Sequence, residues 1–483
     1  MKSPRSPIGL ALLLVALAWQ QPAHGHLGSP DIFVEGQAGP YRLLVTVRPP
    51  YAIPGVADVD ILTTSDDIQD IRIVPLPLTG EGAKFAPVAD RAVRSADDPR
   101  LFTGQLWLMS AGAWQVRVTV IGDLGDGTLS VPVPTLPQST LAMSPVLRAT
   151  LFVLMLLLAT GFVGIISAMV REARLGAGEL VDRRARLRGR IAGAVATVVV
   201  GGIVYLGNMW WSVEASTYAQ YVYKPLTATP SVTSDGRLKL AVQDPGWIGS
   251  RRLDDFVTDH GHLMHLFVVS PALDRLWHLH PEEVATGAFE QQLPDVSAGQ
   301  YELFADLVHA TGVSETVTAK FDTAAIHGAP LSGDDSAWSE SESASRRSGE
   351  SSQTGDGGRI VWLRDEAPLV PKRLTMFTFR VEDAAGQPAR DLELYMGMPG
   401  HAVFMRRDRT VFAHVHPSGS VPMAAMAIAM ASNPAHAQHN ATPAPPSTVT
   451  FPYGFPRPGS YRIFVQVKRA GRVMTEVFDA DVK

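Results

Sequence analysis

The sequence contains no cysteine among its 483 residues. Disulfide bonds, thiolate zinc sites, iron–sulfur clusters and cysteine nucleophiles are therefore excluded. A metal ion would have to be held by histidine, methionine, carboxylate or backbone groups.

The chain also lacks a large excess of charge of either sign. Its formal net charge is −5, so there is no basic surplus to neutralise the phosphates of a nucleic acid. The sequence has no G-x-S-x-G elbow, Walker loop, dinucleotide fingerprint or H-E-x-x-H helix. We therefore expect neither a nucleic-acid-binding protein nor an enzyme.

Residues 1–25 have the layout of a secretory signal peptide. Lys2 and Arg5 precede an apolar run over 8–19, and small residues follow it. Cleavage after Gly25 would make His26 the first residue of the mature chain, whose amine and imidazole could then bind one copper ion together. Cleavage a few residues away, which would remove this site, is the alternative.

Two further apolar runs, 149–170 and 191–211, contain no charge. Each has about the 20 residues that a helix needs to cross a bilayer. The segment between them, 171–190, contains seven arginines, and arginine-rich loops stay in the cytoplasm. We predict a hairpin in a bacterial inner membrane with both termini in the periplasm. The alternative is a pair of buried core helices.

The rest of the chain has the patterns of β-structure. Residues 26–145, 224–322 and 359–483 alternate apolar and polar side chains between Pro- and Gly-rich turns. We predict a mainly β fold of three immunoglobulin-like or cupredoxin-like β-sandwich domains plus the two-helix transmembrane hairpin. The Ser-rich segment 323–358 is predicted to be a disordered linker. A Met- and His-rich insertion, 421–447, interrupts the last domain.

A 17-residue pattern occurs twice in the sequence. It reads "HLFVVSPALDRLWHLHP" at 265–281 and "HAVFMRRDRTVFAHVHP" at 401–417. Histidine occupies the same three places in each copy: His265, His278 and His280 in the first, and His401, His414 and His416 in the second. Each copy is followed by a Gly-x-Tyr strand, at 298–307 and 458–467. The first β segment has a related strand at 111–120 without the histidines.

The spacing of these histidines predicts a β-hairpin that carries them on one face. If 271–274 forms a tight turn, His265 lies directly across from His280, and His278 stays within reach on the same face. The same arithmetic around a turn at 408–409 pairs the first and last histidines of the second copy. Three imidazoles gathered in this way suit a first-row metal such as copper or zinc.

Other candidate ligands lie near both copies. His260, His262 and Met264 precede the first, Asp259 could accept a hydrogen bond from a ligating ring, and His309 lies beyond the Gly-x-Tyr strand. The candidates near the second copy are Met396, Met398, Met423, Met426, Met430, His436 and His439. Thioethers beside imidazoles favour copper, especially Cu(I).

A purely structural role is the alternative for these residues. Histidines on strands often pack against aromatic rings, and a duplicated hairpin would duplicate them for that reason alone. Met423, Met426 and Met430 are spaced as on one face of a helix, which usually indicates packing.

The strand "GPYRLLVTVRPP" at 39–50 and the repeated Gly-x-Tyr strands resemble the YtkA-like and FixH-like exported β-sandwich domains. The domain order is similar to that of uncharacterised bacterial membrane proteins associated with heavy-metal handling. Together with the histidines, this resemblance suggests a membrane-anchored periplasmic protein that binds copper, or zinc, for delivery, transport or resistance. The alternatives are a FixH-like assembly protein that binds protein partners, and copper oxidoreductase chemistry.

Overall fold

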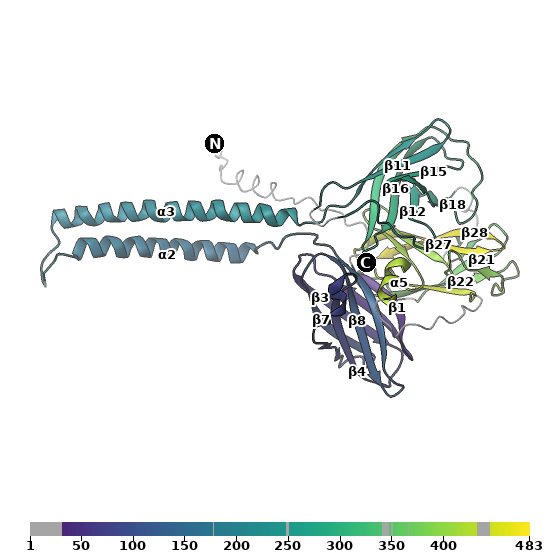
Figure 1. Cartoon of the computed structure of the whole chain (residues 1–483), viewed down its shortest axis with the longest axis horizontal. Coiled ribbons are helices and arrows are strands. Elements are labelled where there is room, and N and C mark those ends of the chain that lie inside the picture. Colours follow the sequence, from purple (N-terminus) through teal and green to yellow (C-terminus); the bar gives the residue numbers. More distant parts are fainter. Residues whose placement is uncertain are drawn as a thin grey trace, which may run out of the picture.

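The computed structural model describes residues 31–176, 178–247, 251–340, 347–348, 351–365, 367–431 and 445–483. The predicted signal peptide, His26, His436 and His439 lie outside these residues. The described chain is mainly β, as predicted, and its strands form six antiparallel sheets that gather in one body (Figure 1).

The first two sheets form what we call the N-terminal unit, residues 31–135. Their strand orders are β1-β2-β3-β7-β6 and β5-β4-β8-β9. Every second residue of β2 is buried from Tyr41 to Val47, and these side chains join one core with residues of the other sheet. The strands are β1 (Ile32–Ala38), β2 (Tyr41–Arg48), β3 (Gly55–Thr63), β4 (Ile68–Pro77), β5 (Asp90–Arg91), β6 (Val93–Arg94), β7 (Leu101–Leu108), β8 (Gly112–Gly122) and β9 (Gly127–Thr135), with a 3-10 turn at Glu81–Lys84.

The next two sheets form the middle unit, residues 226–339, with strand orders β10-β11-β15-β14 and β17-β16-β12-β13-β18. The strands are β10 (Thr227–Val232), β11 (Arg237–Gln243), β12 (Met264–Val269), β13 (Arg275–Leu279), β14 (Glu282–Ala285), β15 (Ala288–Gln292), β16 (Gly299–Val308), β17 (Ser314–Thr323) and β18 (Ser336–Ser339). β18 pairs with β13. This part of the predicted linker 323–358 is therefore a strand and not a disordered segment, because it completes the sheet edge beside β13.

The last two sheets form the C-terminal unit, residues 347–483. One has the order β19-β20-β21-β22-β26 and the other β23-β27-β24-β25, with β28 also paired to β27. The elements are β19 (Arg347–Ser348), β20 (Ser351–Gln353), β21 (Arg359–Leu363), β22 (Thr375–Glu382), β23 (Leu392–Glu393), β24 (His401–Arg406), β25 (Phe412–Val415), α5 (Met423–Ala431), β26 (Thr448–Tyr453), β27 (Gly459–Arg469) and β28 (Arg472–Val482). β19 and β20 also fall within the predicted linker.

Both repeated segments form hairpins in the predicted register. Leu266 pairs with Leu279 between β12 and β13, and Ala402 pairs with Val415 between β24 and β25. Continuing each register outward by one residue brings His265 opposite His280 and His401 opposite His416, as the spacing predicted.

The two hairpins face each other across the contact between the middle and C-terminal units. All six residues of β12 are buried, because this strand has a core on each face. Leu266 and Val268 point into the core of the middle unit. Phe267 and Val269 point the other way, where they join Phe412 and other C-terminal residues in a separate apolar cluster. The repeat therefore builds a sheet-on-sheet interface inside one chain.

The Met-rich insertion contributes a helix that packs on the N-terminal unit. Met426 of α5 is buried in the core of that unit. Backbone hydrogen bonds from Glu35 N to Ser418 O, 2.8 Å, and from Ser420 N to Phe33 O, 2.9 Å, fix the same contact. The helical spacing of the methionines thus reflects packing, which was the structural alternative for this segment.

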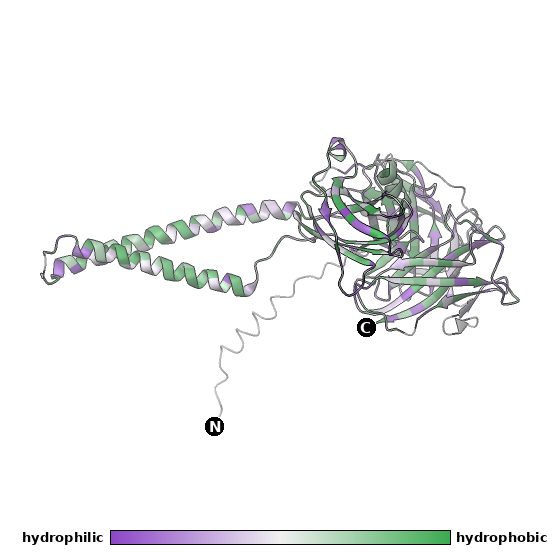
Figure 2. Cartoon of the chain, turned by 90° about the horizontal axis from the view of Figure 1, so that it is seen from below, coloured by the Kyte–Doolittle hydropathy of each residue, from purple (hydrophilic) through white to green (hydrophobic). Residues whose placement is uncertain are grey.

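Two long helices, α2 (Pro145–Glu172) and α3 (Arg183–Gln220), project away from the β body as an antiparallel hairpin (Figure 1). Both are long and apolar enough to cross a membrane, and their most apolar windows are 0% and 11% buried. Neither is therefore buried as a core helix would be. Figure 2 shows apolar residues along both helices and hydrophilic residues near the turn that joins them.

Candidate metal centre

Eight histidines gather where the two hairpins meet. Their ring centroids form a continuous chain of neighbours, and the closest pair, His262 and His280, is 4.0 Å apart. The eight are His260, His262, His265, His278, His280, His401, His414 and His416. The two histidine sets that the sequence predicted separately thus lie in one place, next to the apolar cluster between the units.

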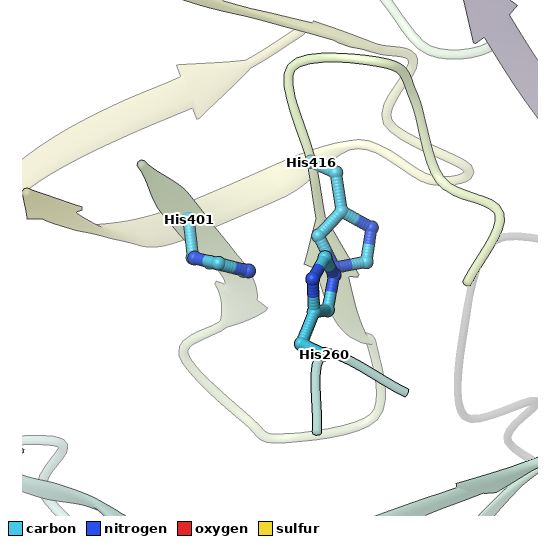
Figure 3. A group of neighbouring side chains, drawn as sticks. All are labelled: His260, His401 and His416. Carbon is cyan, nitrogen blue, oxygen red and sulfur yellow. The ribbon is translucent and has the colours of Figure 1, made fainter. Parts of the chain in front are cut away.

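One group of three consists of His260, His401 and His416 (Figure 3). One ring nitrogen of each lies within 4.8 Å of the others, a spacing that could hold a metal ion. His401 begins β24 and His416 follows β25, whereas His260 comes from the middle unit, in the loop before β12. The sequence predicted a group of His401, His414 and His416. In the structure, His260 from the middle unit takes the place of His414 in this group.

The loop at His260 explains how this side chain reaches the other unit. His260 and Gly261 both have positive φ, 52° and 88°, and Asp259 and His262 close the turn with two backbone hydrogen bonds. The His260 Nδ1–H donates to the carbonyl of Met396, 2.8 Å away. This bond fixes the ring with Nε2 free, in the manner of the second hydrogen bonds that orient metal-binding imidazoles.

The C-terminal unit has the same turn at the equivalent place. Tyr395 and Met398 exchange two backbone hydrogen bonds, and Met396 has a φ of 50°. Met396 therefore occupies the position of His260 in the repeat. The two copies differ in this loop, where one has histidines and the other methionines.

The second group consists of His265, His278 and His280, which again lie with ring nitrogens within 4.8 Å of one another. All three belong to the first hairpin, as the sequence predicted. Met264, the neighbouring candidate, is buried in the core on the opposite face of β12, because successive strand residues alternate between faces.

The hydrogen bonds around this group place two bare nitrogens opposite each other. His265 Nε2 lies 3.0 Å from the carbonyl of Asp259, which can only accept, so Nε2 carries the proton and Nδ1 does not. The Gln466 amide nitrogen donates to Ser336, leaving its Oε1 to accept from His278 Nδ1–H at 2.9 Å. His265 Nδ1 and His278 Nε2 then face each other at 3.3 Å, each with a lone pair.

That distance matches two ligands of one ion. Nitrogens bound at about 2.0–2.1 Å with a tetrahedral angle lie roughly 3.3 Å apart. A hydrogen bond cannot join two acceptors, whereas a metal cation between the nitrogens could bind both.

Further ring nitrogens of the centre are buried with no hydrogen-bond partner among the described residues. Nearly all buried polar atoms in proteins have such a partner, so a cluster of exceptions requires an explanation. The atoms are His260 Nε2, His280 Nε2, His414 Nε2 and both ring nitrogens of His401.

Six of the eight imidazoles of the centre are held in their neutral form. Burial, together with repulsion from neighbouring imidazoles, lowers the pKa of His265, His278, His401 and His416 well below the usual 6.5. Burial likewise lowers the pKa of His414 to about 3 and lowers that of His280. Neutral imidazole is the form that binds metal ions, so these rings need lose no proton to do so.

Sequence reasoning missed the residues that orient these rings. Gln466 of β27 accepts from His278 in the other unit, and Asp306 Oδ2 of β16 lies 3.4 Å from His414 Nδ1 in the other unit. Asp306 and Gln466 occupy equivalent places in the two Gly-x-Tyr strands. Each unit therefore orients a histidine of its neighbour. The equivalent polar residues in the two aligned Gly-x-Tyr strands are the sequence feature that could have identified them. His280 is oriented by Asp335 at 2.9 Å.

Two residues predicted as candidate ligands lie at the margin of the histidine centre or outside it. His262 stacks on His280, but its side chain is 30% exposed and its Nε2 lies 3.4 Å from Asp334. His309 instead bonds Asp255 at 2.7 Å and lies 3.4 Å from Glu315. The pKa of His309 is raised: burial lowers it, but these carboxylates more than offset that effect. His309 therefore belongs to a separate ion-pair network.

Buried carboxylates adjoin the centre. Asp259 Oδ2 lies 4.0 Å from His260 Nε2, and burial raises the pKa of Asp259 and raises that of Asp306 to about 7. Cations in the centre would be partly offset by these two groups. The arrangement can hold two ions, one at each group of three, without any thiolate.

Comparison with known proteins adds a family match. A family model described as "Domain of unknown function (DUF8832)" matches residues 219–325 and 353–483, the two segments that carry the histidine hairpins. No curated protein matches the chain.

Three solved structures were compared with the chain. The tetra-tandem repeat of a large adhesion protein is 8% identical, with 89% of this chain and 71% of that chain covered and a TM-score of 0.17. Chicken CNTN1 FN1–FN3 is 7% identical, with 90% of this chain and 97% of that chain covered and a TM-score of 0.14. Native Escherichia coli alpha-2-macroglobulin is 10% identical, with 95% of this chain and 22% of that chain covered and a TM-score of 0.20. These TM-scores are too low to support an argument about function. The sequence similarity found is that to the family of unknown function.

Proposed function

We propose that this protein is a membrane-anchored periplasmic metal-binding protein that holds two copper ions between its middle and C-terminal units. In this proposal the units are immunoglobulin-like or cupredoxin-like sandwiches, and the protein serves copper delivery, transport or resistance. The observation that carries the proposal is the pair of bare nitrogens of His265 and His278, 3.3 Å apart, within a buried group of neutral imidazoles.

The ligand set favours copper or zinc over harder cations. Imidazole suits copper and zinc, whereas calcium and magnesium prefer oxygen ligands. Thioethers at the repeat positions of His260 and His262, supplied by Met396 and Met398, support copper over zinc, because soft sulfur selects Cu(I). Zinc is the alternative ion.

The proposal is tested by metal analysis of the purified full-length chain in detergent. After loading with Cu(I), and separately with Zn²⁺, and removal of free metal, we expect two ions per chain. His260→Ala should retain one ion, since this change removes one ligand of the group with His401 and His416. His327→Ala is the matched control, because that side chain is 93% exposed and lies beside Asp295, in neither group of three, and it should retain both.

Less than one ion per chain in the unaltered protein would contradict metal binding and leave the assembly role as the better proposal. Two ions retained by His260→Ala would contradict the assignment of His260 across the interface.

A further inference from the structure

A cavity of about 440 Å³ adjoins the histidine centre and is lined by all three units. Its inner wall includes His265, His414 and His416, which are buried. Its lining also includes Tyr51 and Pro225, which are exposed to solvent. The cavity therefore extends from the surface of the molecule to the buried imidazoles.

The outer end of the cavity lies at the base of the helical hairpin. Gln138, which precedes α2, donates its N–H to Tyr51 O at 2.7 Å, and Tyr223, which follows α3, donates to Pro137 O at 2.8 Å. All of these residues except Pro137 line the cavity. The mouth thus faces the same side of the body as the two apolar helices.

The cavity wall offers carboxyl oxygens that could ligate a cation. Asp31, Asp259, Asp306 and Glu315 line it, and the described lining residues include no lysine or arginine. Glu315 is paired with Arg251 at 2.8 Å, so the wall supplies oxygen ligands and not a strong negative field. The buried His414 Nε2, which has no hydrogen-bond partner among the described residues, points to a metal cation as the ligand.

His414 lines the cavity beside His265 of one group and His416 of the other, and so adjoins the cavity and both groups. Its ring centroid is 5.4 Å from that of His265 in one group and 5.4 Å from that of His401 in the other. Among the described residues it belongs to neither group and its Nε2 has no hydrogen-bond partner. Its Nδ1 lies 3.4 Å from Asp306 Oδ2 on the cavity wall.

We propose that the cavity is the entry and exit route for copper, and that His414 is a transfer ligand that passes the ion between the cavity and both histidine groups. This inference rests on the proposed function. Transfer is an exchange of ligands: the ion gains a nitrogen of a histidine group and loses that of His414, with no change of oxidation state.

The route is tested by the rate of Cu(I) transfer from the loaded full-length chain in detergent to excess bathocuproine disulfonate, followed by absorbance. Ser314→Trp places a bulky ring on the cavity wall, where Ser314 is half-buried. We expect two ions at equilibrium and a transfer rate about tenfold lower, because passage then requires the wall to move. Ser231→Trp, at an exposed position of β10, is the matched control and should transfer at the original rate.

The role of His414 is tested by His414→Gln. We expect two ions at equilibrium and slower transfer to the chelator. Loss of one ion would make His414 a resident ligand and overturn the transfer role, and unchanged rates in both His414→Gln and Ser314→Trp would overturn the route. Failure of the unaltered chain to bind any copper would instead overturn the proposed function, so the two outcomes are distinct.

Discussion

The histidines of the centre differ in the group that accepts a hydrogen bond from the ring nitrogen facing away from the neighbouring imidazoles. His260 is held by the Met396 carbonyl, His278 by Gln466 and His280 by Asp335. Each of these bonds fixes which nitrogen carries the proton and leaves the other bare. At the scale of single residues, the centre is therefore preorganised for a cation by its hydrogen bonds.

The neutral state of these rings predicts how the metal-free protein responds to acid. In the unfolded chain each histidine takes up a proton near pH 6.5, whereas in the folded state burial keeps the pKa of His265, His278, His401 and His416 well below this value. The unfolded state thus binds more protons as the pH falls. The free energy of unfolding should fall by about 1.4 kcal/mol per histidine between pH 7.5 and 5.5.

Urea unfolding of the metal-free chain at the two pH values, followed by tryptophan fluorescence, measures this change. His414→Gln should reduce the pH dependence by the contribution of one histidine, since the pKa of His414 is lowered to about 3. Equal stability at both pH values would contradict neutral burial of the rings.

At the scale of elements, each hairpin carries histidines at one end and apolar packing residues at the other. The histidines occupy the open end of the hairpin, and Phe267 of β12 and Phe412 of β25 pack against each other nearer the turn, with ring centroids 5.3 Å apart. Phe267 also stacks on His278 at 4.1 Å. The apolar contact therefore both joins the sheets and limits the positions of the rings.

Phe267→Ala should destabilise the contact between the two sheets. This side chain is fully buried, and removal of a buried phenyl ring costs about 3–5 kcal/mol. Phe85→Ala is the matched control, because Phe85 is 77% exposed and surface changes stay within about 0.5 kcal/mol. Urea unfolding of the copper-free chains compares the two, and equal losses would show that Phe267 does not join the sheets.

At the scale of the whole molecule, the two apolar helices lie between the N-terminal and middle units in the sequence and project from the β body in space. The helix contacts involve small residues of α3, such as Gly189, whose carbonyl accepts from Ser167 Oγ at 2.9 Å. Small residues allow close helix packing in membranes. The seven arginines of 171–190 support an orientation with that segment in the cytoplasm.

Labelling of single cysteines tests this orientation without background, since the natural chain has no cysteine. Val88→Cys and Leu180→Cys each replace a side chain that is 93% exposed. In spheroplasts, a membrane-impermeant maleimide should label the first, in the N-terminal unit, and should label the second only after lysis. Labelling of Leu180→Cys in intact spheroplasts would contradict a cytoplasmic turn.

The sequence alone was sufficient for local features that depend on neighbouring residues. Alternation gave the strands, apolar length gave the two helices, and the equal spacing of His265 and His280 with His401 and His416 gave both hairpin registers. These features follow from periodicity and turn length, which are properties of short segments. The same local reasoning failed at Ser336–Ser339, where a polar segment forms a strand because an open sheet edge beside β13 accepts it.

Only the tertiary structure decided that the two hairpins face each other, that His260 joins His401 and His416, and that Asp306 and Gln466 each orient a ring of the opposite unit. Residues separated by more than 100 positions meet there. Their meeting depends on how two sheets pack, and the repeat by itself could not specify it. The sequence determined which imidazoles share a hairpin face, while sheet packing determined which imidazoles share a site.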